Sequence, residues 1–193
     1  PSKRYPVVMS QYSGPGSQSV LDKWTIDWEY YLVSKGFIVA CVDGRGTGGR
    51  SRAYETSVYM QLGKLETEDQ VAGAEYMRTL PYVDDKHIGI YGWSYGGYET
   101  LMAMSTSNGT YQAGVAIAPV TDWRYYDTIY AERFMRTPNE NNEGYEQSAP
   151  ITHAEKLKGD LLIISGTADD NVHYLNTLQY SAALIEAGIQ FDT

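Results

Sequence analysis

Clustered positive charge is the first thing that this sequence lacks. Its 193 residues carry 15 Lys and Arg against 24 Asp and Glu, which makes the formal net charge −9. No block of basic residues interrupts this acidic balance. Nucleic-acid binding needs clustered cations that neutralise phosphates, so we expect no nucleic-acid partner.

Cysteine and long apolar runs are equally scarce. The single cysteine, Cys41, excludes an intrachain disulfide, and its place in the apolar run 37–42 predicts a small core residue. No run approaches the about 18 consecutive apolar residues of a membrane-spanning helix, so we expect no membrane contact from this segment. The cysteine count and the absence of long apolar runs do not indicate a cellular compartment.

Both ends of the sequence lack the usual signals. It opens on Pro1 without an initiating methionine or a signal peptide, and residues 190–193 follow a predicted helix in a pattern typical of an opening strand. We interpret both ends as cut. The 42% hydrophobic content still suffices for a core, so we expect a single domain over 1–193 that is incomplete at its C-terminal end.

Extended and helical patterns alternate along the chain, which predicts an α/β protein with a mostly parallel sheet and helices on both faces. The predicted strands cover 6–12, 37–42, 87–92, 113–118 and 161–165. The predicted helices cover 22–35, 66–80, 98–107 and 172–187. Residues 119–160 form a connection long enough to indicate a functional excursion.

A candidate nucleophile lies between a predicted strand and a predicted helix. Gly92-Trp93-Ser94-Tyr95-Gly96 fits G-x-S-x-G, in which small residues permit a tight turn that exposes the serine. The alternative is a glycine-rich turn without chemistry. Asp169 argues against that alternative, because it follows a later strand and gives the order Ser then Asp of an α/β-hydrolase triad.

The triad histidine is missing from this pattern. His87 and His153 precede Asp169, and His173 follows it by too few residues to reach Ser94 from a loop on the next strand. We therefore expect the catalytic histidine beyond Thr193.

Two segments of the sequence invite a cofactor interpretation. Residues 44–49 satisfy G-x-G-x-x-G after a strand, but residues 50–64 intervene where a dinucleotide-binding fold requires an immediate helix. Asp169, Asp170 and His173 could also form a metal site. A role of the carboxylates beside a triad serine explains them better. We expect neither cofactor nor metal.

Four segments together resemble the catalytic domain of the prolyl oligopeptidase family of serine peptidases: 43–48, 92–98, 118–133 and 166–173. The resemblance covers nearly the whole chain and implies an α/β-hydrolase fold truncated before its last strands. It also implies a serine-type dipeptidyl peptidase that cleaves after proline or alanine near the N-terminus of peptides, through an acyl-enzyme on Ser94.

The same resemblance implies the site residues. Ser94 is the nucleophile, Asp169 orients the histidine, and the Tyr12 hydroxyl joins the Tyr95 main-chain N–H in the oxyanion hole. Asn171 binds a substrate carbonyl. The walls of the proline pocket match Tyr95, Val120, Trp123, Tyr126, Tyr130 and Val172; without the resemblance, plain core packing explains these aromatic residues.

Further expectations rest on the resemblance alone. The family's β-propeller, which grips the substrate's N-terminus, is absent here. The peptide partner carries proline at its penultimate position, the parent protein can form a homodimer, and relatives suggest a periplasmic or extracellular location. Two alternatives stay open: an esterase that uses the same serine, and a non-catalytic interaction module with a hydrolase-like fold.

Overall fold

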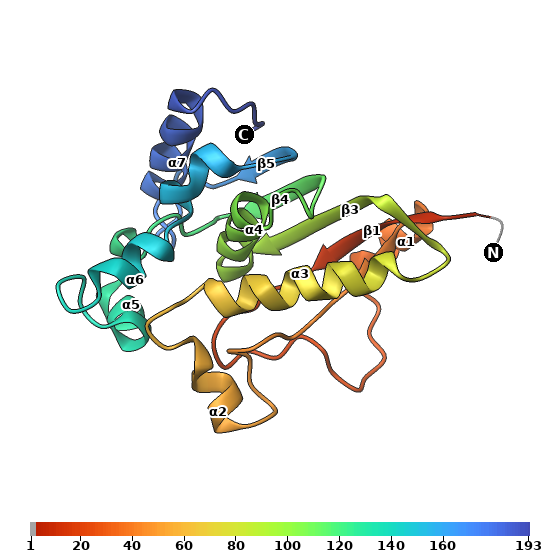
Figure 1. Cartoon of the computed structure of the whole chain (residues 1–193), viewed down its shortest axis with the longest axis horizontal. Helices are drawn as coiled ribbons and strands as arrows, with labels where there is room; N and C mark the ends of the chain where they lie inside the picture. Colours follow the sequence, from red (N-terminus) through yellow and green to blue (C-terminus); the bar gives the residue numbers. More distant parts are fainter. Residues whose placement is uncertain (1–2) are drawn as a thin grey trace.

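A computed structural model describes residues 3–193 of the chain. Five parallel strands form one sheet in the order β2-β1-β3-β4-β5 (Figure 1). Their bounds are β1 (Tyr5–Ser10), β2 (Ile38–Ala40), β3 (Val83–Trp93), β4 (Ala113–Ile117) and β5 (Asp160–Ile164). The α/β class with a parallel sheet is confirmed.

Helices connect the strands and build the excursion after β4. They are α1 (Glu29–Ser34), α2 (Arg52–Glu55), α3 (Lys64–Arg78), α4 (Tyr95–Thr106), α5 (Thr128–Met135), α6 (Asn142–Gln147) and α7 (Leu175–Glu186). Three 3₁₀ segments accompany them: η1 (Thr56–Val58), η2 (Trp123–Tyr125) and η3 (Pro150–Lys156). In the described residues 3–193, no helix has the length and apolar character needed to cross a bilayer.

The main core lies between one face of the sheet and helices α3, α4 and α7. Successive strand residues point to opposite faces, so alternate positions such as Met9 and Ile90 are buried against these helices. The opposite face is more open: Ile164 is 45% exposed. On that face Trp28, just before α1, packs on Tyr91 with ring centroids 4.8 Å apart.

A second core forms at the carboxyl ends of the strands. The predicted excursion 119–160 is folded there into α5, α6, η2 and η3, beside the sheet edge towards which the strand arrows point (Figure 1). Its buried residues include side chains from η1, α4, η2, α5 and α6. The excursion therefore contributes a wall to the edge of the sheet at which a site was predicted.

The predicted helix 22–35 is wrong in its first half, because α1 begins only at Glu29. Trp24 and Ile26 are 82% and 75% exposed. Most helical stability in proteins comes from packing an apolar face. Trp24 meets the edge of the Tyr30 ring, with centroids 6.1 Å apart, but Trp24 and Ile26 both remain largely exposed to solvent. Periodicity alone therefore overestimated the helix.

The prediction that Cys41 is a core residue is also wrong. Cys41 follows β2, the edge strand of the sheet, and is exposed. Partial desolvation and the nearby carboxylates of Asp43 and Glu29 raise the pKa of its thiol to about 11. The thiol therefore stays protonated at neutral pH and is a poor nucleophile.

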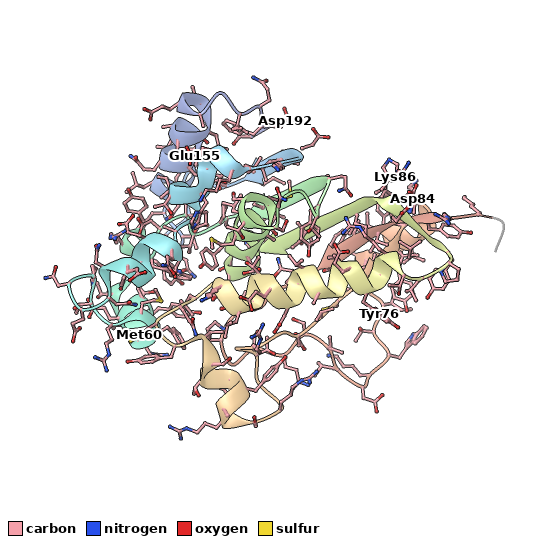
Figure 2. All side chains as sticks on the ribbon, viewed as in Figure 1. Met60, Tyr76, Asp84, Lys86, Glu155 and Asp192 are labelled. Carbon is pink, nitrogen blue, oxygen red and sulfur yellow. The ribbon has the colours of Figure 1, made fainter. Side chains whose placement is uncertain are left out.

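The strand expected at 190–193 does begin beside β5. Asp192 pairs with Leu162 in the parallel sense, its N–H donates to the Leu161 carbonyl at 2.8 Å, and its carbonyl accepts from Ile163 at 2.9 Å. Figure 2 shows Asp192 close to this edge of the sheet.

Candidate active site

Ser94 occupies the turn between β3 and α4, as the motif predicts. Its backbone adopts φ 59° and ψ −114°, a strained conformation that L-residues rarely adopt. Its N–H donates to the carbonyl of Ile117 in β4 at 2.8 Å. The neighbouring strand thus holds the strained turn in place.

The glycines around Ser94 are required by close backbone approach. A Cβ on Gly96 would lie 2.5 Å from the carbonyl oxygen of Gln11, and one on Gly97 would lie 2.5 Å from that of Ile117. A Cβ on Gly92 would overlap the Gly96 carbonyl. The start of α4 is therefore pressed directly against the ends of β1 and β4.

Asp169 lies on the loop after β5, at the same edge of the sheet as Ser94. Its Oδ1 accepts the backbone N–H groups of Asn171 and Val172, both at 3.0 Å. Its Oδ2 accepts no hydrogen bond from residues 3–193, which leaves this oxygen available for an imidazole N–H. The two backbone donors fix the orientation of the carboxylate.

The three histidines make no hydrogen bond to the serine or the aspartate within residues 3–193. His87 lies midway along β3 and pairs with Asp84 at 2.8 Å, and Figure 2 shows Asp84 at the end of the sheet opposite α5 and α6. His153 Nε2 bonds to the Gln147 carbonyl at 2.9 Å. His173 is exposed on the loop before α7.

Tyr12 lies on the turn after β1 and is 40% exposed. Its ring centroid is 6.1 Å from that of Tyr95, the residue that follows Ser94. Gly14 keeps the turn tight, since a Cβ there would lie 2.5 Å from Tyr12 Cε1. Desolvation raises the pKa of the Tyr12 phenol, so the hydroxyl keeps its proton and remains a hydrogen-bond donor.

The predicted pocket residues do come together. Trp123 lies among Tyr95, Tyr126 and Tyr130, with ring centroids 5.5, 5.9 and 5.8 Å away. The Tyr130 ring stacks on it at an interplanar angle of 23°. Val120 and Val172 belong to the same cluster. Flat, stiff apolar surfaces of this kind suit a compact ring without hydrogen-bond donors.

Asn171 borders the aromatic cluster. Its Oδ1 accepts the Tyr126 hydroxyl at 2.7 Å. This bond directs the side chain towards the cluster, and its amide N–H groups have no partner within residues 3–193. They are therefore able to donate to a carbonyl.

Two buried carboxyl groups next to the start of α4 were not predicted. Glu66 and Glu99 are both fully buried and accept the hydroxyls of Tyr95 and Thr67, each at 2.8 Å. Burial raises the pKa of Glu66 to about 7 and raises that of Glu99 further above its usual range. The helical pattern predicted α3, but nothing local marks Glu66 as facing inward.

A parallel sheet with a strained serine between strand and helix and a fixed aspartate after a later strand defines an α/β-hydrolase of the serine type. The sequence model described as the prolyl oligopeptidase family matches residues 24–193, and the chain belongs to this family of serine peptidases.

Individual relatives agree with this assignment. The chain is 46% identical over 194 residues to a probable dipeptidyl-aminopeptidase B of Metarhizium robertsii and 48% identical to one of Talaromyces marneffei. It covers 98% of its own length in both alignments but 21% and 22% of these relatives.

Solved structures extend the comparison. Dipeptidyl peptidase 4 of Porphyromonas gingivalis matches with a TM-score of 0.97 and 58% identity over 99% of this chain and 27% of that one. A putative dipeptidyl aminopeptidase IV of Bacteroides ovatus matches with a TM-score of 0.96 and 40% identity, with the same coverage. The chain thus spans about a fifth to a quarter of the length of these relatives.

Proposed function

We propose that this chain is the nucleophile-bearing part of a serine-type dipeptidyl peptidase that cleaves after proline or alanine near the N-terminus of peptides. One observation carries the proposal: the strained Ser94 is followed directly by Tyr95, whose ring belongs to the aromatic cluster around Trp123. A side chain seated in that cluster would place its own carbonyl beside the serine. The names of the relatives, dipeptidyl-aminopeptidase and dipeptidyl peptidase, support the release of dipeptides.

The proposed reaction begins with acylation of the serine. A histidine removes the Ser94 proton while Oγ attacks the carbonyl carbon, and Asp169 holds the imidazole in the correct tautomer. The Tyr12 hydroxyl and the Tyr95 main-chain N–H donate to the oxygen of the tetrahedral intermediate, where negative charge develops. The C–N bond then breaks, the histidine protonates the leaving amine, and water hydrolyses the acyl-enzyme.

Proline selectivity is proposed to come from the shape of the aromatic cluster. The half-buried rings of Tyr126 and Tyr130, backed by the buried Trp123, would offer flat walls for a pyrrolidine ring, and the methyl group of alanine is small enough to enter. Asn171, held by Tyr126, would donate to a substrate carbonyl and orient the peptide. The penultimate residue would thereby be selected.

The catalytic histidine is proposed to lie outside these 193 residues, in a longer polypeptide. The support is the engagement of His87 and His153 elsewhere and the greater length of the relatives. Loss of a triad member typically lowers the rate by several orders of magnitude, so we propose that residues 1–193 alone are inactive.

A comparison of the 193 residues with a full-length version tests both statements. A glycine-proline chromogenic amide and a simple acyl ester serve as substrates, with Ser94→Ala as the control. We expect the full-length protein to cleave the prolyl amide and the 193 residues to leave it intact. Equal activity of both chains would refute the missing histidine, preference for the ester would favour an esterase, and inactivity of both would favour a non-catalytic module.

A further inference from the structure

Tyr12 is an exposed residue between two buried ones. Gln11 and Ser13 are 6% and 1% exposed, whereas Tyr12 is 40% exposed. Polar side chains are seldom buried without hydrogen-bond partners, so the two neighbours require an explanation. Both side chains have hydrogen-bond partners on other elements of the fold.

A continuous buried chain of hydrogen bonds passes through both neighbours of Tyr12. Gln70, from α3, donates through Nε2 to Ser13 Oγ at 3.2 Å, and the Ser13 hydroxyl donates to Gln11 Oε1 at 2.9 Å. Gln11 Nε2 then donates to the Gly96 carbonyl at 2.8 Å and to Thr100 Oγ1 at 3.2 Å. This hydrogen-bond relay, formed by Gln70, Ser13 and Gln11, therefore links α3, the turn after β1 and the start of α4.

The backbone is constrained at the same points. Ser13 adopts φ 65°, in the left-handed region that non-glycine residues avoid, so the turn depends on its surroundings for this conformation. The Gln11 N–H donates to the Tyr91 carbonyl of β3 at 3.1 Å. The Gln11 carbonyl lies so close to Gly96 that a Cβ there would be 2.5 Å away.

We propose that Gln11, Ser13 and Gln70 are positioning residues that fix the Tyr12 hydroxyl relative to Ser94. The inference rests on the proposed oxyanion role of Tyr12. An oxyanion donor is effective only when it is aimed in advance at the developing charge. Tyr12 is half-exposed on a turn, so it obtains that rigidity from its two buried neighbours.

Two variants of the full-length enzyme interrupt the relay without touching Tyr12. Ser13→Ala removes the central hydroxyl, and Gln70→Met removes the donor from α3 at similar volume. We expect each to lower kcat for a glycine-proline amide by roughly tenfold and to leave KM within about twofold, because displacement of a catalytic group costs turnover. Gln70→Met keeps the Ser13 side chain and gives the measurement if Ser13→Ala fails to fold.

Ser105→Ala is the matched control. Ser105 is also a buried serine, 3% exposed, but its hydroxyl pairs with Tyr180 of α7 at 3.3 Å, outside the relay. This variant should lower the melting temperature to a similar extent and leave kcat unchanged. A fall in kcat for all three variants in proportion to lost stability would overturn the positioning role.

A double-mutant cycle separates positioning from general stability. In a Tyr12→Phe background, Ser13→Ala should lower kcat by less than about threefold, since the hydroxyl that it positions is gone. Full additivity, or an unchanged kcat in both relay variants, overturns the inference while the proposed function stands. If Tyr12→Phe alone leaves kcat unchanged in an active enzyme, the oxyanion role fails and the positioning role fails with it.

Discussion

The hydroxyl of Tyr95 donates to Glu66 Oε1 at 2.8 Å, which links the residue after the nucleophile to the first turn of α3. Both side chains are buried, and Glu66 Oε2 has no hydrogen-bond partner among residues 3–193. A buried carboxyl group with one unpaired oxygen holds its proton more tightly than an exposed one. The floor of the serine elbow therefore contains a group that titrates near neutrality.

This titration predicts a pH-dependent stability. Burial raises the pKa of Glu66 from 4.5 to about 7, so the folded state binds the proton more tightly than the unfolded state does. Between these values the free energy of unfolding should fall as pH rises, by at most about 1.4 kcal/mol per pH unit. Glu66→Gln cannot titrate and should lose less stability than the wild type between pH 5 and pH 7.

Urea unfolding of both proteins at several pH values measures the difference in slope. Glu155→Gln is the control, because Glu155 is exposed on η3 (Figure 2). It should unfold with the same pH dependence as the wild type. Parallel curves for Glu66→Gln and the wild type would contradict the raised pKa.

Removal of the Tyr12 hydroxyl tests the oxyanion hole. Tyr12→Phe keeps the ring packed near Tyr95 but removes a donor, so kcat of the full-length enzyme should fall by about 10²-fold or more. Steady-state kinetics on a glycine-proline amide gives the value. Tyr76→Phe, at a 64% exposed position of α3, should have no effect, and an equally small effect of Tyr12→Phe would exclude the assigned role.

Adjacent aspartates provide a matched pair for the triad. Asp169→Asn keeps an oxygen for the Asn171 and Val172 N–H groups but can no longer stabilise a histidine in the correct tautomer. We expect kcat to fall by about 10⁴-fold, as for other triads of this type. Asp170→Asn changes the same charge at an exposed neighbour and should leave turnover near the wild-type value. Similar losses in both variants would argue against Asp169 as the triad acid.

Close packing of the elbow predicts a further difference between two glycines. A Cβ at Gly97 would lie 2.5 Å from the Ile117 carbonyl, whereas one at Gly166 meets nothing within 4 Å. Gly97→Ala should therefore lower the free energy of unfolding by about 1–3 kcal/mol, as overpacking does. Gly166→Ala should change it by less than about 0.5 kcal/mol. Thermal melting of both variants measures this difference. Equal stability of Gly97→Ala and Gly166→Ala would show that α4 can move away from β4.

Local patterns predicted where the candidate nucleophile and the candidate acid lie in the fold, because each belongs to a short motif with a distinct backbone requirement. The strand-turn-helix around Ser94 is visible in a few residues, and so is the carboxylate after β5. Cys41 and the residues before Glu29 were misassigned because burial at the edge of a sheet depends on what covers that edge. Neighbouring sequence does not contain this information.

The buried polar groups were beyond sequence reasoning for a related reason. Gln70 and Ser13 are 57 positions apart, and Glu66 and Tyr95 are 29 apart. Each pair forms only once the strands and helices are assembled. A polar side chain on a helix is usually expected to face water, so Glu66 and Gln70 carried no sign that they point inward.

The hydrogen bond from Ser94 to Ile117 has a consequence for the geometry of the proposed site. The segment that begins at Ile117 supports the nucleophile at its start and forms the aromatic wall a few positions later at Val120 and Trp123. In the proposed peptidase, the serine and the pocket for the substrate ring would therefore be held by one continuous stretch of backbone, 117–123. A change in this segment should then disturb the position of the serine and the shape of the pocket together.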